Sequence, residues 1–328
     1  MKGPERFGRG SRRDPADVTN CGAGAHPPDR PSPLAGRVDS LPDEPDLSPV
    51  KSATDTPDRR FRLTLHYDGE RFHGWQVQPG ERTVQAEIES ALSRLAGRTV
   101  RVIGAGRTDT GVHATGQVAS TSVPGHWTAA DLHRALNAVL PHDIWTESVA
   151  EAVRDFHARY DAVARGYMYR VGTQPYARSP FLRRWCWPLC HTLDMDLLEA
   201  AASRLVGTHS FQSFSRTGQP ERGYRCTLHR SQWTRARMGL EYRVIADRFL
   251  HHTVRYLVGT MVDVSRRRRP VDDIDALLRG VAGMVTSPPA PAAGLFLVRV
   301  YYEDAELSHD IETAGLAFGD TGIGFAHA

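Results

Sequence analysis

The chain has 328 residues, 40% of them hydrophobic, and carries a formal net charge of +3 from 41 basic and 38 acidic residues. No apolar run reaches the length of a membrane-spanning helix, which excludes an integral membrane protein of the helical kind. The four cysteines lack the spacing of a disulfide framework or of paired zinc knuckles, so we expect a soluble, cytoplasmic protein with reduced thiols.

The two ends of the chain differ in composition from the middle. Residues 1–58 contain ten prolines and no apolar periodicity, and their acidic and basic residues nearly balance. Such a segment buries too little apolar surface to offset its ordering entropy, so it is expected to be a disordered N-terminal extension. A start codon assigned too far upstream explains it equally well. Residues 303–328 are acidic and then Gly-rich, and we expect this tail to be loose as well.

The excess of positive charge lies between these ends, which favours a polyanionic partner. The two lysines, Lys2 and Lys51, both lie in the N-terminal extension, so every cation of the middle region is an arginine. Arginine makes bidentate contacts with phosphate and stacks on bases, and both properties suit a nucleic acid.

From residue 61, apolar spacing alternates between the period of a strand and that of a helix. The first half of the region is predicted to contain strands over 61–67, 100–103, 117–123 and 144–153, with helices beginning at Thr83 and Thr128. Gly97 ends the first helix. Asp131 completes a capping-box pattern at the second.

The same order of elements then recurs. Strands are predicted over 156–171, 226–233, 240–246 and 295–301, with helices from Asp194, over 249–264 and after Pro270. Two successive β-α-β-β-α-β passes predict an α+β fold. We expect two ferredoxin-like (RRM-like) halves, 59–160 and 161–302, with antiparallel sheets joined around a central cleft and helices on one side.

The strongest candidate for a functional segment is residues 104–120, which follow a predicted strand and read GAGRTDTGVHATGQVAS. Glycines surround a single carboxylate, Asp109, and Arg107 precedes it by two residues. A nearby guanidinium favours the ionised carboxylate, which suits a nucleophile or a base. The spacing fits neither a dinucleotide fingerprint nor a P-loop, and the second aspartate typical of aspartyl phosphatases is absent.

This stretch resembles the signature of the tRNA pseudouridine synthase A (TruA) family, R-T-D-x-G-V-H-x-x-G-Q. The matching residues are Arg107, Thr108, Asp109, Gly111, Val112, His113, Gly116 and Gln117. The resemblance implies that Asp109 is catalytic and that Arg107 enters the space left by the target base or contacts the RNA backbone. His113 and Gln117 would be supporting residues.

Other family stretches lie in the second half. Tyr167 lies in an A-R-x-Y-x-Y pattern, where the resemblance implies that it stacks on the target base. Residues 249–255 match F-x-H-H-x-V-R, which implies that Arg255 pairs with Asp109. His252, together with Phe214 of a shorter matching stretch, would be a supporting residue.

Three further patterns have ordinary structural explanations. The tandem histidines suggest a metal site, but adjacent residues on a helix diverge by about 100°, so capping or core roles are expected instead. The cysteines and His191 do not have zinc-site spacing, and no metal is expected. The four consecutive arginines at 266–269 form either a solvated helix end or a contact with tRNA phosphates.

The resemblance implies isomerisation of uridine to pseudouridine at positions 38, 39 and 40 of the tRNA anticodon stem-loop, by a homodimer that needs no cofactor. The carboxylate could attack the sugar C1′, attack the base C6, or remove a proton from C2′, and the sequence leaves these three open. The alternatives are an RRM-like RNA-binding protein without catalysis and a pseudouridine synthase with a different RNA specificity.

Overall fold

The computed structural model describes residues 57–216 and 223–313, and these form an α+β fold as expected. The segments outside these ranges include nearly all of the predicted N-terminal extension and the Gly-rich end of the tail. No helix among the described residues combines the length and apolar character needed to cross a membrane.

The first half of the described chain has a β-α-β-β-α-β order. Its elements are β1 (Arg59–Tyr67), α1 (Val84–Ala96), β2 (Val102–Gly104), β3 (His113–Val123), α2 (Ala129–Val139) and β4 (Ile144–Glu151). The predicted caps form here. Thr83 accepts a hydrogen bond from the amide of Ala86, and Gly97 ends α1 in the left-handed conformation. Thr128 accepts from the amide of Asp131 at the start of α2.

The second half repeats this order with additions. Its elements are β5 (Ala164–Gly172), α3 (Met195–Ser203), β6 (Gly207–Ser210), β7 (Arg225–Ala236), β8 (Gly239–Ala246), α4 (Thr253–Ser265), α5 (Asp273–Leu278), β9 (Leu295–Tyr301) and α6 (Asp304–Glu312). The described residues also form short 3-10 turns, one in the first half at Gly69–Arg71 (η1) and four in the second at Pro175–Arg178 (η2), Arg183–Trp185 (η3), Gln212–Phe214 (η4) and Ala292–Gly294 (η5).

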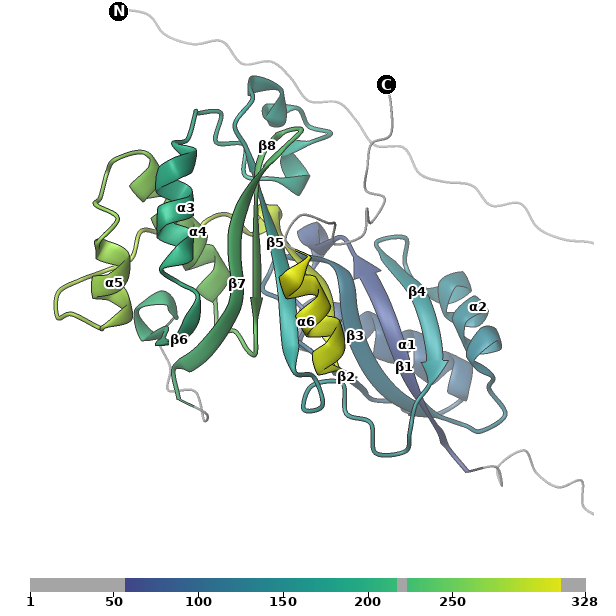
Figure 1. The fold of residues 1–328 in the computed structure, drawn as a ribbon. Coiled ribbons are helices and arrows are strands. Elements are labelled where there is room, and N and C mark those ends of the chain that lie inside the picture. The colour runs from purple at the N-terminus through teal and green to yellow at the C-terminus, as the bar shows by residue number, and fades with distance from the viewer. Residues whose placement is uncertain (1–56, 217–222, 314–328) are drawn as a thin grey trace, which may run out of the picture. The chain divides into compact units, whose positions relative to one another are not determined.

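All the strands join one sheet, in the order β4-β1-β3-β9-β5-β8-β7-β6, with β2 paired to β3 (Figure 1). The pairs within each half are antiparallel. The halves meet where β3 and β9 run parallel, at His113 beside Phe296 and Ala114 beside Leu297. Only two residue pairs form this junction.

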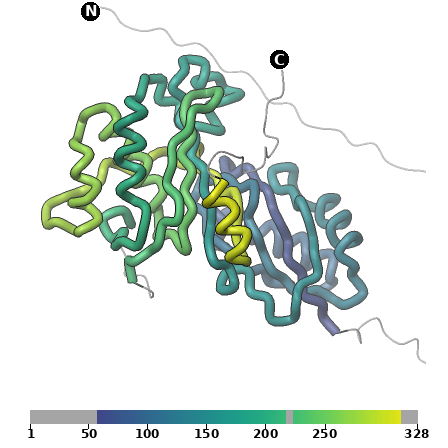
Figure 2. Tube along the Cα trace, in the orientation of Figure 1, coloured from purple at the N-terminus to yellow at the C-terminus, as the bar shows by residue number. Residues whose placement is uncertain are grey.

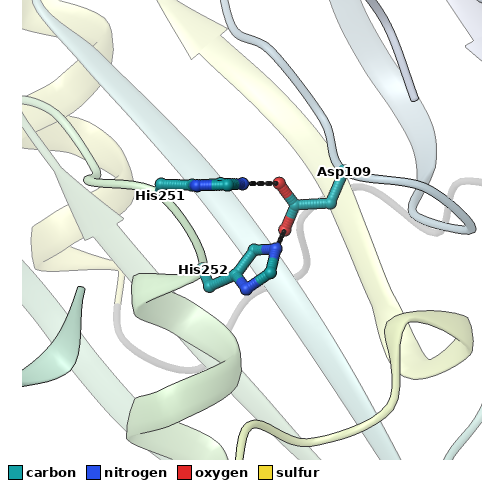
Figure 3. Close-up of side chains that lie close together, drawn as sticks. All are labelled: Asp109, His251 and His252. Atoms are coloured by element: carbon teal, nitrogen blue, oxygen red, sulfur yellow. Dashed lines mark ion pairs between the residues drawn. The ribbon is translucent and has the colours of Figure 1, made fainter. Parts of the chain in front are cut away.

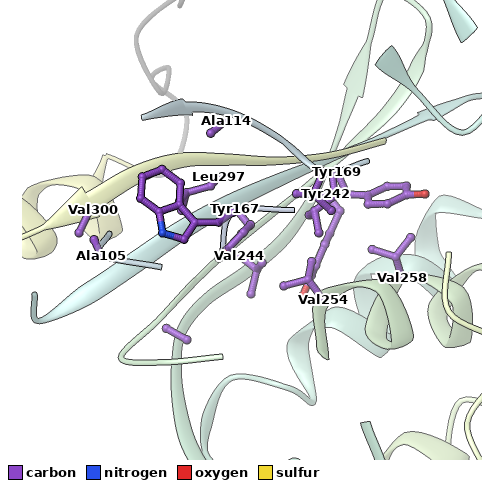
Figure 4. Close-up of a cluster of buried hydrophobic side chains, with 14 of the residues drawn as sticks. Ala105, Ala114, Tyr167, Tyr169, Tyr242, Val244, Val254, Val258, Leu297 and Val300 are labelled. Carbon is purple, nitrogen blue, oxygen red and sulfur yellow. The ribbon is translucent and has the colours of Figure 1, made fainter. Parts of the chain in front are cut away.

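Helices α1 to α4 contribute to one hydrophobic core that spans both halves. Ala105 of the first half, Tyr167 of β5 and Val254 of α4 belong to the same buried cluster (Figure 4). Figure 2 follows the chain from the first half into the second. The core therefore continues across the junction.

The acidic segment that we expected to be loose contains α6. Leu307 is 8% exposed and packs with Ala164, Ile245 and Tyr301 on the sheet face opposite the main core. The carboxylate of Asp310 accepts hydrogen bonds from Tyr301 and Arg299. These contacts join α6 to residues of β5, β8 and β9. The helix therefore depends on tertiary packing, which the composition of the segment does not reveal.

Two predicted boundaries were also wrong. The strand expected over 156–171 begins only at Ala164, because residues before it form a turn in which Asp161 accepts from the amide of His157. The helix expected over 249–264 begins at Thr253, and the four residues before it are not helical. The segments before Ala164 and Thr253 are therefore free of regular structure and supply residues that are described below.

Candidate active site

The signature loop runs from the end of β2 to the start of β3 and is anchored by its own downstream strand. The amide of Ala105 donates to the carbonyl of Val118 at 2.7 Å. The fully buried Gln117 side chain donates from Nε2 to the carbonyl of Gly106 at 2.7 Å, and its Oε1 accepts from the Gly106 amide at 3.3 Å. The structure thus places Gln117 as a support for the loop backbone.

A second loop, residues 69–75, braces the part of the signature loop that carries the aspartate. The amide of Trp75 donates to the carbonyl of Thr108 at 3.0 Å, and the amide of Gly111 donates to the carbonyl of Phe72 at 3.3 Å. The Thr108 hydroxyl lies 2.8 Å from the hydroxyl of Tyr67 on β1. The backbone on either side of Asp109, at Thr108 and Gly111, is therefore held by other residues of the first half.

The Asp109 carboxylate faces three cationic or polar groups from the second half, and Figure 3 shows two of them, His251 and His252. Its Oδ1 lies 3.4 Å from Nε2 of His251, and its Oδ2 lies 3.3 Å from Nε2 of His252. The same Oδ2 lies 3.6 Å from Nη1 of Arg255. The carboxylate side chain is 20% exposed, so solvent or a substrate can reach it.

The two histidines share the carboxylate because they do not lie on a helix together. His252 has a φ of 66°, in the left-handed region that residues with a side chain seldom adopt, and it immediately precedes α4. Its side chain makes no cap hydrogen bond. The expectation that adjacent histidines diverge, and that they cap or fill the core, was therefore wrong.

The protonation of these groups follows from their surroundings. Burial lowers the pKa of His252 below its ordinary value, and the nearby cations Arg255 and Arg216 lower it further, although Asp109 acts in the opposite direction. His252 is thus neutral at pH 7. Arg255 is the permanent positive charge beside the carboxylate.

Arg255 is held by two hydrogen bonds to one residue before β9. Its Nε donates to the carbonyl of Ala290 at 2.7 Å, and its own carbonyl accepts from the Ala290 amide at 2.9 Å. Its side chain is 16% exposed. The guanidinium is consequently oriented by the backbone, with Nη1 left to face Asp109.

Tyr167 lies on β5 next to the signature loop, as the sequence suggested. Its ring packs edge-on against Phe249, with centroids 5.0 Å apart, and the side chain is 7% exposed. A methyl group added to Gly106 would lie 3.6 Å from the Tyr167 hydroxyl. Burial raises the pKa of Tyr167 well above its ordinary value, and Tyr67 and Asp109 add to this. The phenol therefore remains neutral beside the carboxylate.

The remaining predicted residues are placed differently. Arg107 is exposed in the signature loop. His113 is 1% exposed, and its ring contacts Asp68, the carbonyl of Arg184 and the face of Phe296, while no ion pair joins it to Asp109 among the described residues. Phe214 is fully buried in the core.

The arginine run at 266–269 is largely engaged within the protein. Arg267 pairs with Asp194, Arg268 with Asp263 and Arg269 with Asp273. Arg267 and Arg268 are still exposed, so a contact with tRNA phosphates stays a prediction.

Asp109, His251 and His252 could also hold a metal ion, because their ligand atoms all lie within 4.8 Å of one another. Two imidazole nitrogens and a carboxylate oxygen form a donor set that suits zinc and similar divalent ions. His251 was not among the site residues predicted from the sequence. Its position in the F-x-H-H-x-V-R stretch was the available signal.

Comparisons with known proteins agree with the signature. A family model described as tRNA pseudouridine synthase matches residues 64–161 and 201–303. A protein of Geobacillus kaustophilus named tRNA pseudouridine synthase A is 40% identical over 254 residues, covering 77% of this chain and 98% of the relative. Its namesake in Moorella thermoacetica is 41% identical over 246 residues, covering 74% and 99% respectively. The segments matched by the family model include Asp109, both histidines and Arg255.

Proposed function

The chain belongs to the tRNA pseudouridine synthase family, and we propose that Asp109 is the catalytic residue of its isomerase reaction. The enzyme converts uridine in tRNA to pseudouridine. The N1–C1′ bond breaks, a C5–C1′ bond forms, a proton leaves C5 and N1 gains one. Nothing is oxidised, and no second molecule donates a group.

One observation carries the proposal: a reachable carboxylate of the signature loop meets Arg255 and two histidines of the second half. A carboxylate in such a place can act as a nucleophile or as a base. Attack at C1′, attack at C6 and proton removal from C2′ are all compatible with this carboxylate. In each case a freed base can re-bond through C5 only if it is retained in the site.

Tyr167 is proposed to retain the base. A uridine paired or stacked in RNA is inaccessible to a side chain, so it must be extruded, and an extruded base is commonly held against an aromatic ring. Tyr167 is neutral and packed against Phe249. It therefore offers a fixed, uncharged surface near Asp109. Arg107, exposed in the same loop, is proposed to fill the vacated position or to contact the RNA backbone.

We further propose that the modified positions are 38, 39 and 40 of the anticodon stem-loop, and that the enzyme acts as a homodimer. Shape and phosphate recognition would dominate, since the cations of the described residues are all arginines.

The halves are proposed to be ferredoxin-like units, 59–160 and 161–302, that complete one site together. The strand orders β4-β1-β3-β2 and β9-β5-β8-β7 support this, because each is the same permutation of four strands. Asp109 comes from the first unit, and Tyr167 and Arg255 from the second.

An RNA-binding module without catalysis would gain nothing from an accessible carboxylate in its binding surface, because the carboxylate would repel phosphate. The test is Asp109→Asn, which keeps the side-chain shape, compared with Asp196→Asn at an exposed carboxylate on α3. We expect Asp109→Asn to bind unmodified tRNA normally but to lose at least about 10³-fold in single-turnover rate, as loss of a central catalytic group typically does.

Product is mapped by carbodiimide primer extension on unmodified tRNA. Pseudouridine formed by Asp109→Asn at the rate of Asp196→Asn would refute the assignment of Asp109. Modification confined to sites other than 38, 39 and 40 would retain the catalytic assignment and refute the specificity.

A further inference from the structure

Arg165 on β5 binds backbone carbonyls from four separate places in the chain. Its Nε and Nη2 donate to the carbonyl of Ala105 at 3.4 and 3.0 Å. Its Nη1 donates to the carbonyls of Ala162 and Asp247, both at 3.0 Å, and Nη2 also donates to that of Arg159 at 2.6 Å. These five hydrogen bonds use the five donors that a guanidinium possesses.

The guanidinium is held by neutral oxygens rather than by a counter-ion. Among the described residues, no carboxylate lies within ion-pair distance of Arg165. Burial lowers the pKa of its guanidinium from the ordinary value, yet an arginine remains charged. A positive charge removed from water without a partner is costly, so its carbonyl contacts must be well formed.

Two of the carbonyls belong to the loops that carry the site. Ala105 opens the signature loop, four residues before Asp109. Asp247 follows β8 and opens the segment that leads, five residues later, to His252. One side chain therefore joins the base of the loop from the first half to the base of the loop from the second.

The contacts at the tips of these loops are looser. The distances from the Asp109 oxygens to His251, His252 and Arg255 are 3.3 to 3.6 Å, longer than ordinary hydrogen bonds. Partly exposed pairs of this kind contribute little to holding two segments together. They also have to yield when a substrate enters. The separation of the two loops must be set elsewhere.

We propose that Arg165 is a positioning residue for the isomerase reaction: it fixes the distance between Asp109 and the His251–His252–Arg255 group by tying together the loops that carry them. The proposal rests on the proposed function of Asp109 and adds a residue that touches none of the reacting atoms. Lysine cannot replace it, since one ammonium cannot reach carbonyls arranged around a planar fork.

The chain contains a control for the loss of a half-buried arginine that binds backbone. Arg60 on β1 donates from Nε and Nη2 to the carbonyl of Phe156 at 2.9 and 2.8 Å, and it also bonds Ser120 and Ser122. Burial lowers the pKa of its guanidinium as well. Arg60 is thus also a partly buried arginine with a lowered pKa, but its partners are one carbonyl and two hydroxyls, and it bonds neither of the two site loops.

The experiment compares Arg165→Lys with Arg60→Lys in the full-length protein. Urea denaturation gives stability, and pseudouridine formation on unmodified tRNA gives kcat and KM. Both variants should lose stability. Only Arg165→Lys should lower kcat, by about 10- to 100-fold, because a small misplacement of a reacting group has effects of this size. Its KM should change by less than about threefold, because tRNA affinity comes mainly from phosphate contacts.

If Arg165→Lys folds poorly, Arg165→Ala is assayed at low temperature with and without millimolar methylguanidinium. The added methylguanidinium should restore the kcat of Arg165→Ala and should leave that of Arg60→Ala unchanged. Equal kcat for the two lysine variants, or absence of rescue, overturns the proposal. Asp109→Asn is measured alongside. An active Asp109→Asn would refute the proposed function itself, whereas an inactive Asp109→Asn with a fully active Arg165→Lys would refute only the positioning role.

Discussion

Gly74 packs closely against the backbone of the signature loop, and its substitution by alanine tests whether the position of Asp109 depends on that packing. Gly74 has a φ of 83°, which favours glycine. A methyl group added there would lie 2.6 Å from the carbonyl oxygen of Thr108 and 3.2 Å from the carbonyl carbon of Asp109. Because these atoms belong to the backbone, neither can rotate away.

Gly74→Ala should lower the free energy of unfolding for two reasons. A left-handed conformation costs an alanine about 1–2 kcal/mol. Relieving the contact requires the Thr108–Asp109 backbone to move by roughly half an ångström, and overpacking of this kind costs about 1–3 kcal/mol more. We therefore expect Gly74→Ala to lower the free energy of unfolding by about 2–5 kcal/mol. The displaced carboxylate should also lower the single-turnover rate by about 10- to 100-fold.

Gly80→Ala is the control, because Gly80 has a φ of 76° and a methyl group there would meet nothing within 4 Å. It should show the conformational cost alone, about 1–2 kcal/mol, with an unchanged rate. Urea denaturation and single-turnover pseudouridine formation at saturating enzyme measure the two effects. If both alanine variants turn over equally fast, close packing against residues 108–109 does not position the carboxylate.

Two further predictions concern the histidines. Burial lowers the pKa of His252, so below pH 6.5 the folded protein binds fewer protons at this group than the unfolded chain does. The contribution of His252 to stability is therefore complete above pH 6.5 and declines as the pH falls below it. Between pH 7.5 and 5, the urea midpoint of His252→Asn should fall less steeply than that of the unsubstituted protein. Zinc ions should inhibit by binding Asp109, His251 and His252, with EDTA restoring activity, and His251→Asn should need at least about tenfold more zinc; equal sensitivity of that variant would place the inhibition elsewhere.

The parts of the fold that could be predicted are those fixed by neighbouring residues. Thr83, Thr128 and Asp194 each accept a hydrogen bond from an amide three residues on, and the helices begin where the sequence placed them. Such contacts depend on a few consecutive residues, which is why pattern and spacing reveal them.

The same kind of local bond also explains an error. The expected strand over 156–171 has a suitable apolar pattern, but His157 Nδ1 accepts from the amides of Arg159 and Tyr160. Side-chain hydrogen bonds of this kind offer the backbone an alternative to the sheet, so the strand starts only at Ala164. Periodicity alone does not show which of the two wins.

The residues of the candidate site also differ in whether neighbouring sequence or distant contacts determine their placement. Asp109 could be selected because its whole signature lies in one stretch, whereas His251 was excluded by treating its neighbour as helical. One left-handed residue, His252, turns both imidazoles toward a carboxylate more than 140 residues away in sequence. The φ of a residue without glycine's freedom is imposed by the surrounding structure and not by its own type.

Arg165 shows a kind of contact that cannot be predicted from the sequence. Its strand pattern and its place beside Tyr167 were visible in the sequence, but two of its acceptors lie 60 and 82 residues away. Carbonyl groups are common to all residues, so no residue type marks them as partners of a guanidinium. The sequence can therefore indicate which side chains perform the chemistry, whereas a residue that acts by holding backbone becomes visible only when the chain is folded. Arg165→Lys against Arg60→Lys tests this distinction, because only the first variant releases the backbone of the two site loops.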